Sequence, residues 1–363
     1  MADDKKGLLT QILVPVAVAL LIGGSAPWWW KALFGKDDNH NSNTSQSLTT
    51  LGQTPPQDAV ASKQGNAADG SSNQRVTANQ SAPAATDSAH FVSPVAPAVS
   101  GVGDNVYFFA TRSDGRVFYN RAKLGESGMG WVEVEGDGKS DAAPAAGAVG
   151  THVFVMIKGV DGNLYLNQAD LGHSFGKWFP MNFTSDVAPA VAGVGDNVYF
   201  FATKPDGRVF YNRAKVGEAG VGWTEVQGDA RTNTPPAAGA VGTHVFLMIK
   251  ALDGNLYLNQ ADLGQSFGQW FPMNFASDVG PTVTGVGDSV YFFAKRSDGR
   301  VFYNYAKLGA GGVGWTEVPG DGRTNVAPAS GAVGTHVFLM IKDLSDKLIL
   351  NQADLGRSFD RWL

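Results

Sequence analysis

Cysteine is absent from this chain of 363 residues. Its absence excludes a disulfide framework, a thiolate metal site and a cysteine nucleophile. An excess of positive charge is also missing, because 28 Lys and Arg stand against 33 Asp and Glu, for a formal net charge of −5. A nucleic-acid-binding surface needs a basic patch, so we expect no nucleic-acid partner.

Catalytic motifs are scarce as well. The sequence has no phosphate-cradling glycine loop and no HExxH pair. Glu133, Glu225 and Glu317 on the predicted outer strand recur only in the odd units, as copies of one environment. A glycosidase with paired carboxylates needs two acids about 5–9 Å apart in one pocket that is not repeated. We therefore expect a protein that is not an enzyme, with no cofactor; a glycosidase or lyase is the least favoured of three hypotheses.

The only long apolar run lies at the N-terminus. No charged residue occurs from Leu8 to Trp30, which is 23 residues. A helix of that length crosses a hydrocarbon core of about 30 Å. Residues 28–30 are three tryptophans, which are typical of the interface between membrane and water. We expect residues 1–36 to be an uncleaved single-pass membrane anchor that spans the bilayer through residues 8–30.

Two alternatives to an anchor stay open, which are a cleaved signal peptide and an interfacial helix. Residues 24–26 read Gly-Ser-Ala, a small-residue cleavage pattern, but Pro27 would follow the cut. The flanking lysines are nearly balanced on the two sides of the run, so they do not set the orientation. A short N-terminus before a large C-terminal domain favours export, so we expect that domain on the extracytoplasmic side.

Residues 37–88 are rich in Ser, Asn, Gln, Thr, Ala, Gly and Pro, and no Phe, Tyr or Trp occurs between Phe34 and Phe91. Such a segment cannot bury enough apolar surface to offset its ordering entropy. We expect a disordered linker that spans on the order of 40 Å. Residues 89–363 then form the folded domain.

The rest of the chain is a repeat with two alternating units. The spacing between equivalent prolines alternates between 47 and 45 residues, so the double unit is 92 residues long and occurs three times. The prolines are Pro97, Pro144, Pro189, Pro236, Pro281 and Pro328. A period of about 46 residues is typical of one propeller blade.

Each unit contains four predicted strands. In the first unit they are of the types PAVSGV, NVYFFAT, RVFYNRA and WVEVEG. An Asp-Gly pair separates the second strand from the third in five of the six units, and this pair is a strong hairpin signal. The second strand is apolar on both faces, which indicates sheets that stack face to face. We expect an all-β fold, a six-bladed β-propeller of four-stranded blades built from three 92-residue double repeats.

The two ends of the domain complement each other. The sixth unit stops at Leu363, where its fourth strand should begin. Within residues 89–94, residues 90–94 align with the end of a fourth strand, at residues 182–186. We expect this N-terminal strand to complete the last blade, so that the ring closes without an exposed sheet edge. An open repeat array is the alternative.

The blade pattern VYFFATRSDGRVFYNRAK, followed by GWVEVEG, resembles the blades of bacterial PLL-type lectins. That family consists of fucose-binding propellers with a similar hairpin and a Trp-containing outer strand, and the resemblance covers residues 91–363. It implies shallow sugar sites repeated around the ring. Those lectins have seven blades, whereas this chain has six. Six-bladed fucose lectins of fungi and plant pathogens use an Arg on the second strand, with a Glu and a Trp; the strand VYFFAT lacks that Arg.

The candidate sugar-binding residues are those that recur on the third and fourth strands. An indole can stack on the C–H face of a sugar while its N–H donates, although the same residue also packs blades together. Third-strand tyrosines and the donors beside the recurring asparagines complete the set. The candidates are Trp131, Trp178, Trp223, Trp270, Trp315, Trp362, Tyr119, Tyr211, Tyr303, Arg121, Arg213, Gln168, Gln260 and Gln352.

Three histidines recur every 92 residues, as His152, His244 and His336. They start second strands, away from the axis, so we expect no shared metal site. The repeated candidates favour several equal binding sites, and weak sites gain affinity through multivalency. We expect a multivalent carbohydrate-binding propeller, of the fucose type that the resemblance implies, displayed from a membrane, with glycans or glycoconjugates as partners. A propeller scaffold or sensor domain that binds a protein or peptide, without sugar activity, is the alternative.

Overall fold

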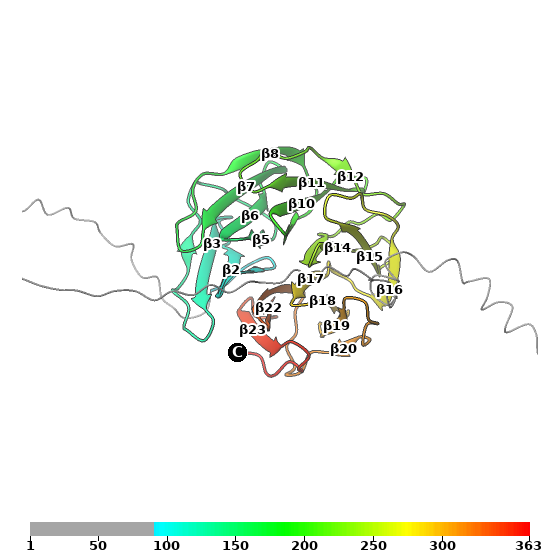
Figure 1. Ribbon diagram of the computed structural model, residues 1–363. Helices are drawn as coiled ribbons and strands as arrows, with labels where there is room; N and C mark the ends of the chain where they lie inside the picture. Colours follow the sequence, from blue (N-terminus) through cyan, green and yellow to red (C-terminus); the bar gives the residue numbers. More distant parts are fainter. Residues whose placement is uncertain (1–90) are drawn as a thin grey trace, which may run out of the picture. The chain divides into compact units, whose positions relative to one another are not determined.

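The computed structural model describes residues 91–363. The predicted membrane span over residues 8–30 and the predicted linker over residues 37–88 lie outside the described residues. Within residues 91–363, no helix is long and apolar enough to span a bilayer. The described residues form six β-sheets around one axis, which confirms the predicted all-β propeller with six blades (Figure 1).

The odd blades each contain four antiparallel strands in chain order, with the first strand at the axis and the short fourth strand at the rim. Blade 1 comprises β1 (Ala98–Val102), β2 (Asn105–Thr111), β3 (Val117–Lys123) and β4 (Val132–Glu133); blade 3 comprises β9 (Ala190–Val194), β10 (Asn197–Thr203), β11 (Val209–Lys215) and β12 (Thr224–Glu225); blade 5 comprises β17 (Thr282–Val286), β18 (Ser289–Lys295), β19 (Val301–Lys307) and β20 (Thr316–Glu317).

The even blades follow the same order, with a longer fourth strand in blades 2 and 4. Blade 2 comprises β5 (Ala145–Val149), β6 (His152–Lys158), β7 (Asn163–Asp170) and β8 (Phe179–Thr184); blade 4 comprises β13 (Ala237–Val241), β14 (His244–Lys250), β15 (Asn255–Asp262) and β16 (Phe271–Ala276); blade 6 comprises β21 (Ala329–Val333), β22 (His336–Lys342) and β23 (Leu348–Asp354).

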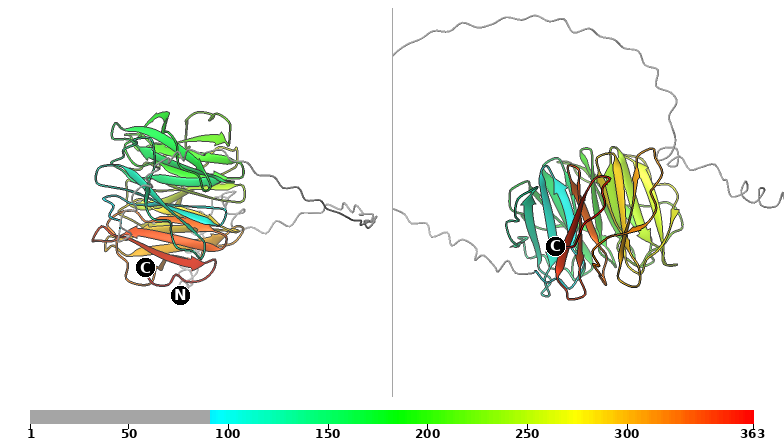
Figure 2. Two further views of the ribbon diagram at one scale, coloured as in Figure 1. Left: turned by 90° about the vertical axis from the view of Figure 1, so that its left-hand side faces the viewer. Right: turned by 90° about the horizontal axis from the view of Figure 1, so that it is seen from below.

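The outer position of blade 6 is occupied by both ends of the described chain. Leu363 and Leu350 exchange two backbone hydrogen bonds, of 3.0 and 2.8 Å. Val92 pairs with Lys347, and the Ser93 N–H donates to the Asp346 carbonyl at 3.3 Å. The first blade therefore lies directly beside the last one, as both Figure 1 and Figure 2 show.

The second strand of each blade is buried on both of its faces, because a blade stands between two others. In β2, Tyr107 and Phe109 pack toward blade 2, and Phe108 packs toward blade 6. This arrangement explains why the strand is continuously apolar rather than alternating.

Glycines of the innermost strands let neighbouring blades approach at the axis. A Cβ on Gly101 would lie 1.7 Å from the Ala332 carbonyl oxygen of the adjacent blade. The double repeat copies this contact, at 1.8 Å, to Gly193 and Gly285. No side chain fits at such distances, so these three positions require glycine.

We predict that Gly101→Ala destabilises the ring by about 3 kcal/mol, at the upper end for overpacking, because the neighbour is backbone and cannot turn aside. Urea unfolding of the full chain measures the change. Gly176→Ala is the matched control, because an added Cβ there meets nothing within 4 Å. Equal stability of the two variants would contradict this account of the axis.

Candidate inter-blade binding pockets

Two kinds of interface alternate around the ring. The interface from an odd blade to the following even blade is filled by a phenylalanine from the loop before the outer strand. Phe175 is 1% exposed, and its ring meets that of Tyr119 edge to face at 5.0 Å. Phe267 and Phe359 repeat this packing in the next two interfaces of the same kind.

The interface from an even blade to the following odd blade lacks this phenylalanine. Three residues before the outer-strand tryptophan, where even blades have Phe, the odd blades have Gly128, Gly220 and Gly312. A cavity of about 380 Å³ lies between blades 2 and 3, and Gly220 lines it. A cavity of about 330 Å³ lies between blades 6 and 1, and Gly128 lines it. Replacement of one aromatic ring by hydrogen thus leaves space at alternate interfaces.

The cavity between blades 2 and 3 combines aromatic walls with polar groups. Phe154 and Phe200 line it from facing blades, with their rings edge to face at 6.4 Å. Trp223, Gln168 and Asn212 also line it. Two of the predicted site residues, Gln168 and Trp223, are therefore brought together, although they belong to different blades.

The cavity between blades 6 and 1 is a copy of this one at the repeat period. Three of its residues have equivalents in the first cavity 92 positions later; they are Phe108, Asn120 and Glu126. Two more have equivalents there 184 positions earlier; they are Phe338 and Gln352. Trp131 is not among the lining residues of this cavity; it packs against the buried cluster behind it and against Phe91, with ring centroids 4.3 Å apart. At the third equivalent interface, Gln260, Asn304, Gly312 and Trp315 occupy the matching positions, and Ala310 stands in place of the glutamate.

The third-strand asparagines have different roles in the two kinds of blade. In blade 2, the Asn167 amide donates to the carbonyls of Gly176, at 2.9 Å, and Glu135, at 3.1 Å, and so ties two blades together. In blade 3, Asn212 Oδ1 accepts the Gly222 N–H at 3.1 Å. Its Nδ2 has no acceptor among the described residues and borders the cavity, where it is available to donate to a ligand.

Charged side chains surround the mouth of each cavity. Lys215 Nζ lies 3.3 Å from Asp196 and 3.9 Å from Glu218. These side chains are half or more exposed, so the pairs add little stability and can rearrange around a ligand.

The tryptophans of the odd blades pack against the preceding blade. Trp223 stacks on Phe183 with ring centroids 4.4 Å apart, and its indole N–H donates to the Met181 carbonyl at 3.0 Å. Trp315 does the same with Phe275 and Met273. In these two residues the indole N–H is thus already bonded within the protein, so only the ring face opposite the phenylalanine can contact a sugar.

The tryptophans of the even blades lie in the filled interfaces instead. Trp178 packs against the turn at Gly136 and Gly138 of blade 1, and its buried Nε1 is closed off there. Trp362 packs against Gly320 and Gly322, and Trp270 packs in the corresponding interface of blades 3 and 4.

The third-strand tyrosines and arginines also belong to the filled interfaces. Tyr119 is 6% exposed, and burial raises the pKa of its hydroxyl above the usual value. Tyr211 and Tyr303 pack in the same way. Arg121 lies against Gly172 of the next blade, as Arg213 lies against Gly264. The structure therefore does not bring these five residues to the two cavities.

The repeated acids and histidines are engaged with neighbours. Glu133 accepts a hydrogen bond from Arg116 at 2.9 Å. The side-chain hydrogen bond from the same arginine holds the pKa of Asp114 below its usual value. His152 pairs with Asp170 at 3.3 Å, and no group of three metal-ligating side chains occurs within residues 91–363.

One catalytic signature is present in the sequence without its structural context. Residues 172–176 read G-x-S-x-G, and residues 264–268 repeat it. A nucleophile elbow needs a turn from a strand into a helix. Residues 91–363 contain no helix, and Phe175 of this segment is buried between blades.

No family model matches the sequence, and no curated protein is similar enough to count as a relative. Solved structures are similar in fold. A mutant of the lectin from Aleuria aurantia, in complex with Fucα1-6GlcNAc, is 12% identical with a TM-score of 0.56, over 73% of this chain and 93% of that one. The BP39L lectin from Burkholderia pseudomallei is 13% identical with a TM-score of 0.54, over 73% and 96%.

A third similar structure, AofleA from Arthrobotrys oligospora, is 11% identical with a TM-score of 0.57, over 76% of this chain and 85% of that one. The Aleuria aurantia lectin is described as a six-bladed β-propeller. At these identities the comparisons establish the fold alone. They support a six-bladed β-propeller fold, and the resemblance to PLL-type lectins stays a prediction.

We predict that Phe175→Ala lowers the free energy of unfolding by about 3–5 kcal/mol, because it leaves a cavity between blades 1 and 2. Gly220→Ala at the matching position of blade 3 should cost under about 1 kcal/mol, because the added Cβ meets only the Asn212 side chain, which can turn. Thermal unfolding of the two full-length variants gives the comparison. A small loss in the free energy of unfolding for Phe175→Ala would contradict the conclusion that Phe175 fills this interface.

Proposed function

We propose that this chain is a multivalent carbohydrate-binding protein whose sites are the cavities between even blades and the odd blades that follow them. One observation carries the proposal: a cavity with aromatic walls, amide groups and a charged rim is copied at the repeat period. Sugars present apolar C–H faces and many hydroxyls, and such pockets match both features.

In the cavity between blades 2 and 3, we assign the ring face of Trp223 to the apolar side of the sugar. The amides of Gln168 and Asn212 take its hydroxyl groups. The equivalent residues at the interface of blades 6 and 1 are Trp131, Gln352 and Asn120. The sites are shallow and individually weak, and binding of one glycan surface by several of them supplies the affinity.

Fucosides are the first ligands to test. Two of the similar structures are described as complexes with Fucα1-6GlcNAc and with α-methyl-L-fucoside. Those descriptions concern other proteins, and they guide only the choice of the first sugar to test.

Display from a membrane is the second part of the proposal. The uncharged run from Leu8 to Trp30 supports a single span, with residues 37–88 as a tether and the propeller on the extracytoplasmic side. We propose no catalytic activity.

A protein- or peptide-binding scaffold is the second candidate, and one observation favours it. Three aliphatic side chains are more than 60% exposed at equivalent turns between the second and third strands of the even blades; they are Val160, Leu252 and Leu344. Each even blade carries one of them at the same turn, so a partner that covers this end of the ring contacts all three.

The test is a glycan array probed with the full chain in mild detergent. We predict binding to a defined glycan class. The triple variant Gly128→Phe, Gly220→Phe, Gly312→Phe copies the even-blade residue into each odd blade and should abolish binding. The gentler triple variant Asn120→Ala, Asn212→Ala, Asn304→Ala should weaken it about five- to tenfold, because each site loses a hydrogen-bond donor.

The matched control is the triple variant His173→Ala, Gln265→Ala, Arg357→Ala, which changes exposed residues of the even-blade loops. It should bind as the unchanged chain does. Absence of binding to every glycan would refute the proposal and make the scaffold the leading candidate. Binding that survives both pocket variants would place the sugar elsewhere.

A further inference from the structure

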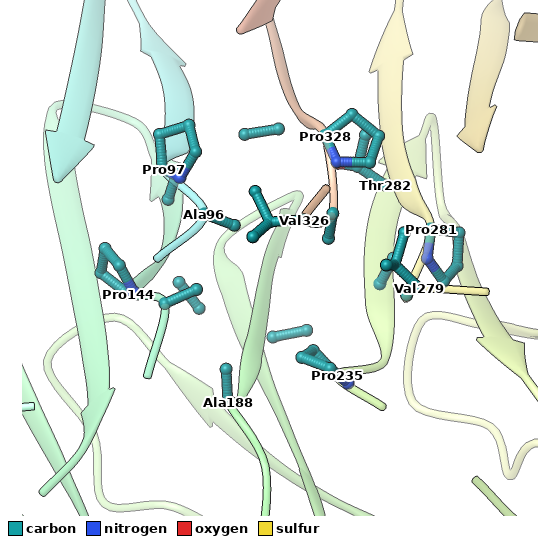
Figure 3. A pocket seen from close by; sticks show the side chains of 18 of the residues that line it. Ala96, Pro97, Pro144, Ala188, Pro235, Val279, Pro281, Thr282, Val326 and Pro328 are labelled. Carbon is teal, nitrogen blue, oxygen red and sulfur yellow. The ribbon is translucent and has the colours of Figure 1, made fainter. Parts of the chain in front are cut away.

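A separate cavity of about 430 Å³ lies on the axis, at the end of the ring where the chain enters each innermost strand. All six blades line it with equivalent residues, several of which surround the open space in Figure 3. It shares no residue with the two inter-blade cavities. Its volume falls within the range of about 300–1,000 Å³ that is usual for small-molecule sites.

The wall of this axial cavity is largely apolar, with Asp278 and Asn325 as the charged and amide side chains among its lining residues. Each blade contributes a proline, and in five of the six a small residue precedes it, as in Ala96-Pro97 and Ala188-Pro189. Proline has no backbone N–H, so six potential donors are missing from the wall. Val279 and Val326 add branched apolar side chains. Water gains few hydrogen bonds in such a space, which favours its displacement by an apolar ligand.

The axial cavity narrows toward the middle of the ring. The next space along the axis measures about 120 Å³ and is lined by residues such as Gly101, Gly193 and Gly285. At these glycines the strands meet too closely for even a methyl group. A ligand in the wider part is thus surrounded by all six blades and faces a narrow floor.

One polar pair breaks the symmetry of the wall. Thr282 and Ser330, from blades 5 and 6, stand where the other blades have alanine or valine; the other polar side chains of the lining are Thr234, Asp278 and Asn325. Their hydroxyl oxygens lie 3.0 Å apart. One hydroxyl can donate to the other, so the remaining hydroxyl hydrogen and lone pairs are available to a ligand.

We propose that the axial cavity is a second binding site, which takes one small, uncharged, largely apolar molecule carrying a single hydroxyl or carbonyl group. The largely apolar wall selects the body of the ligand. The Thr282–Ser330 pair receives its one polar group and fixes its orientation. The site lies on the axis, so it holds one ligand per chain.

The first experiment titrates the full chain with N-phenyl-1-naphthylamine, an uncharged fluorescent probe that carries one N–H. We expect a saturable component of one probe per chain, above the non-saturable signal from the apolar N-terminal run. The double variant Ala96→Leu, Ala188→Leu reduces the cavity and should remove that component. Ala276→Leu is the control, because Ala276 is exposed on an outer strand. The proposal is supported if the double variant loses the saturable component and the Ala276→Leu control retains it.

The second experiment tests the polar pair without changing the cavity volume. Cyclohexanol and the nearly isosteric methylcyclohexane compete for the bound probe in the unchanged chain and in the double variant Thr282→Val, Ser330→Ala. The ratio of their competition constants should shift about fivefold against cyclohexanol, as expected for one lost hydrogen bond. An unchanged ratio, a stoichiometry above one, or a saturable component that survives the cavity-reducing variant would overturn the proposal.

Discussion

The spacing of the blades at the axis depends on glycines of the innermost strands. Gly101, Gly193 and Gly285 each lie against a carbonyl of the neighbouring strand, at a separation that admits no Cβ. Because this contact recurs at the double-repeat period, it sets the blades in a tight circle. It also forms the narrow floor beneath the apolar cavity at one end of the axis.

Farther from the axis, one residue difference separates the two kinds of blade. Even blades place a buried phenylalanine such as Phe175 between themselves and the preceding blade. Odd blades have glycine there, so Gly128 and Gly220 border open cavities. The same difference explains the two roles of the asparagines. Asn167 ties a filled interface together, whereas Asn212 faces a cavity.

The sequence predicted the fold well, because the fold depends on patterns that repeat. The 92-residue period, the Asp-Gly turns and the continuously apolar second strands predict the six blades, of which five have four strands and the sixth has three, with both ends of the described chain at its outer position. The pocket was harder to predict. The Phe175-to-Gly128 difference is visible in the sequence, but its consequence depends on which neighbouring blade the loop faces. The recurring tryptophans occupy one position of the repeat and look equivalent in the sequence, although Trp178 and Trp223 pack in different kinds of interface.

The number of sugar sites tests the central claim, that binding is copied with the repeat, most directly. Titration calorimetry of the full chain with a glycan that it retains would count them. Two cavities contain the facing phenylalanines, the two amides and the glutamate, and the third equivalent interface has Ala310 in place of that glutamate. The account predicts two or three sites of similar affinity per chain. A single site would contradict it and would point to a feature that the repeat does not copy.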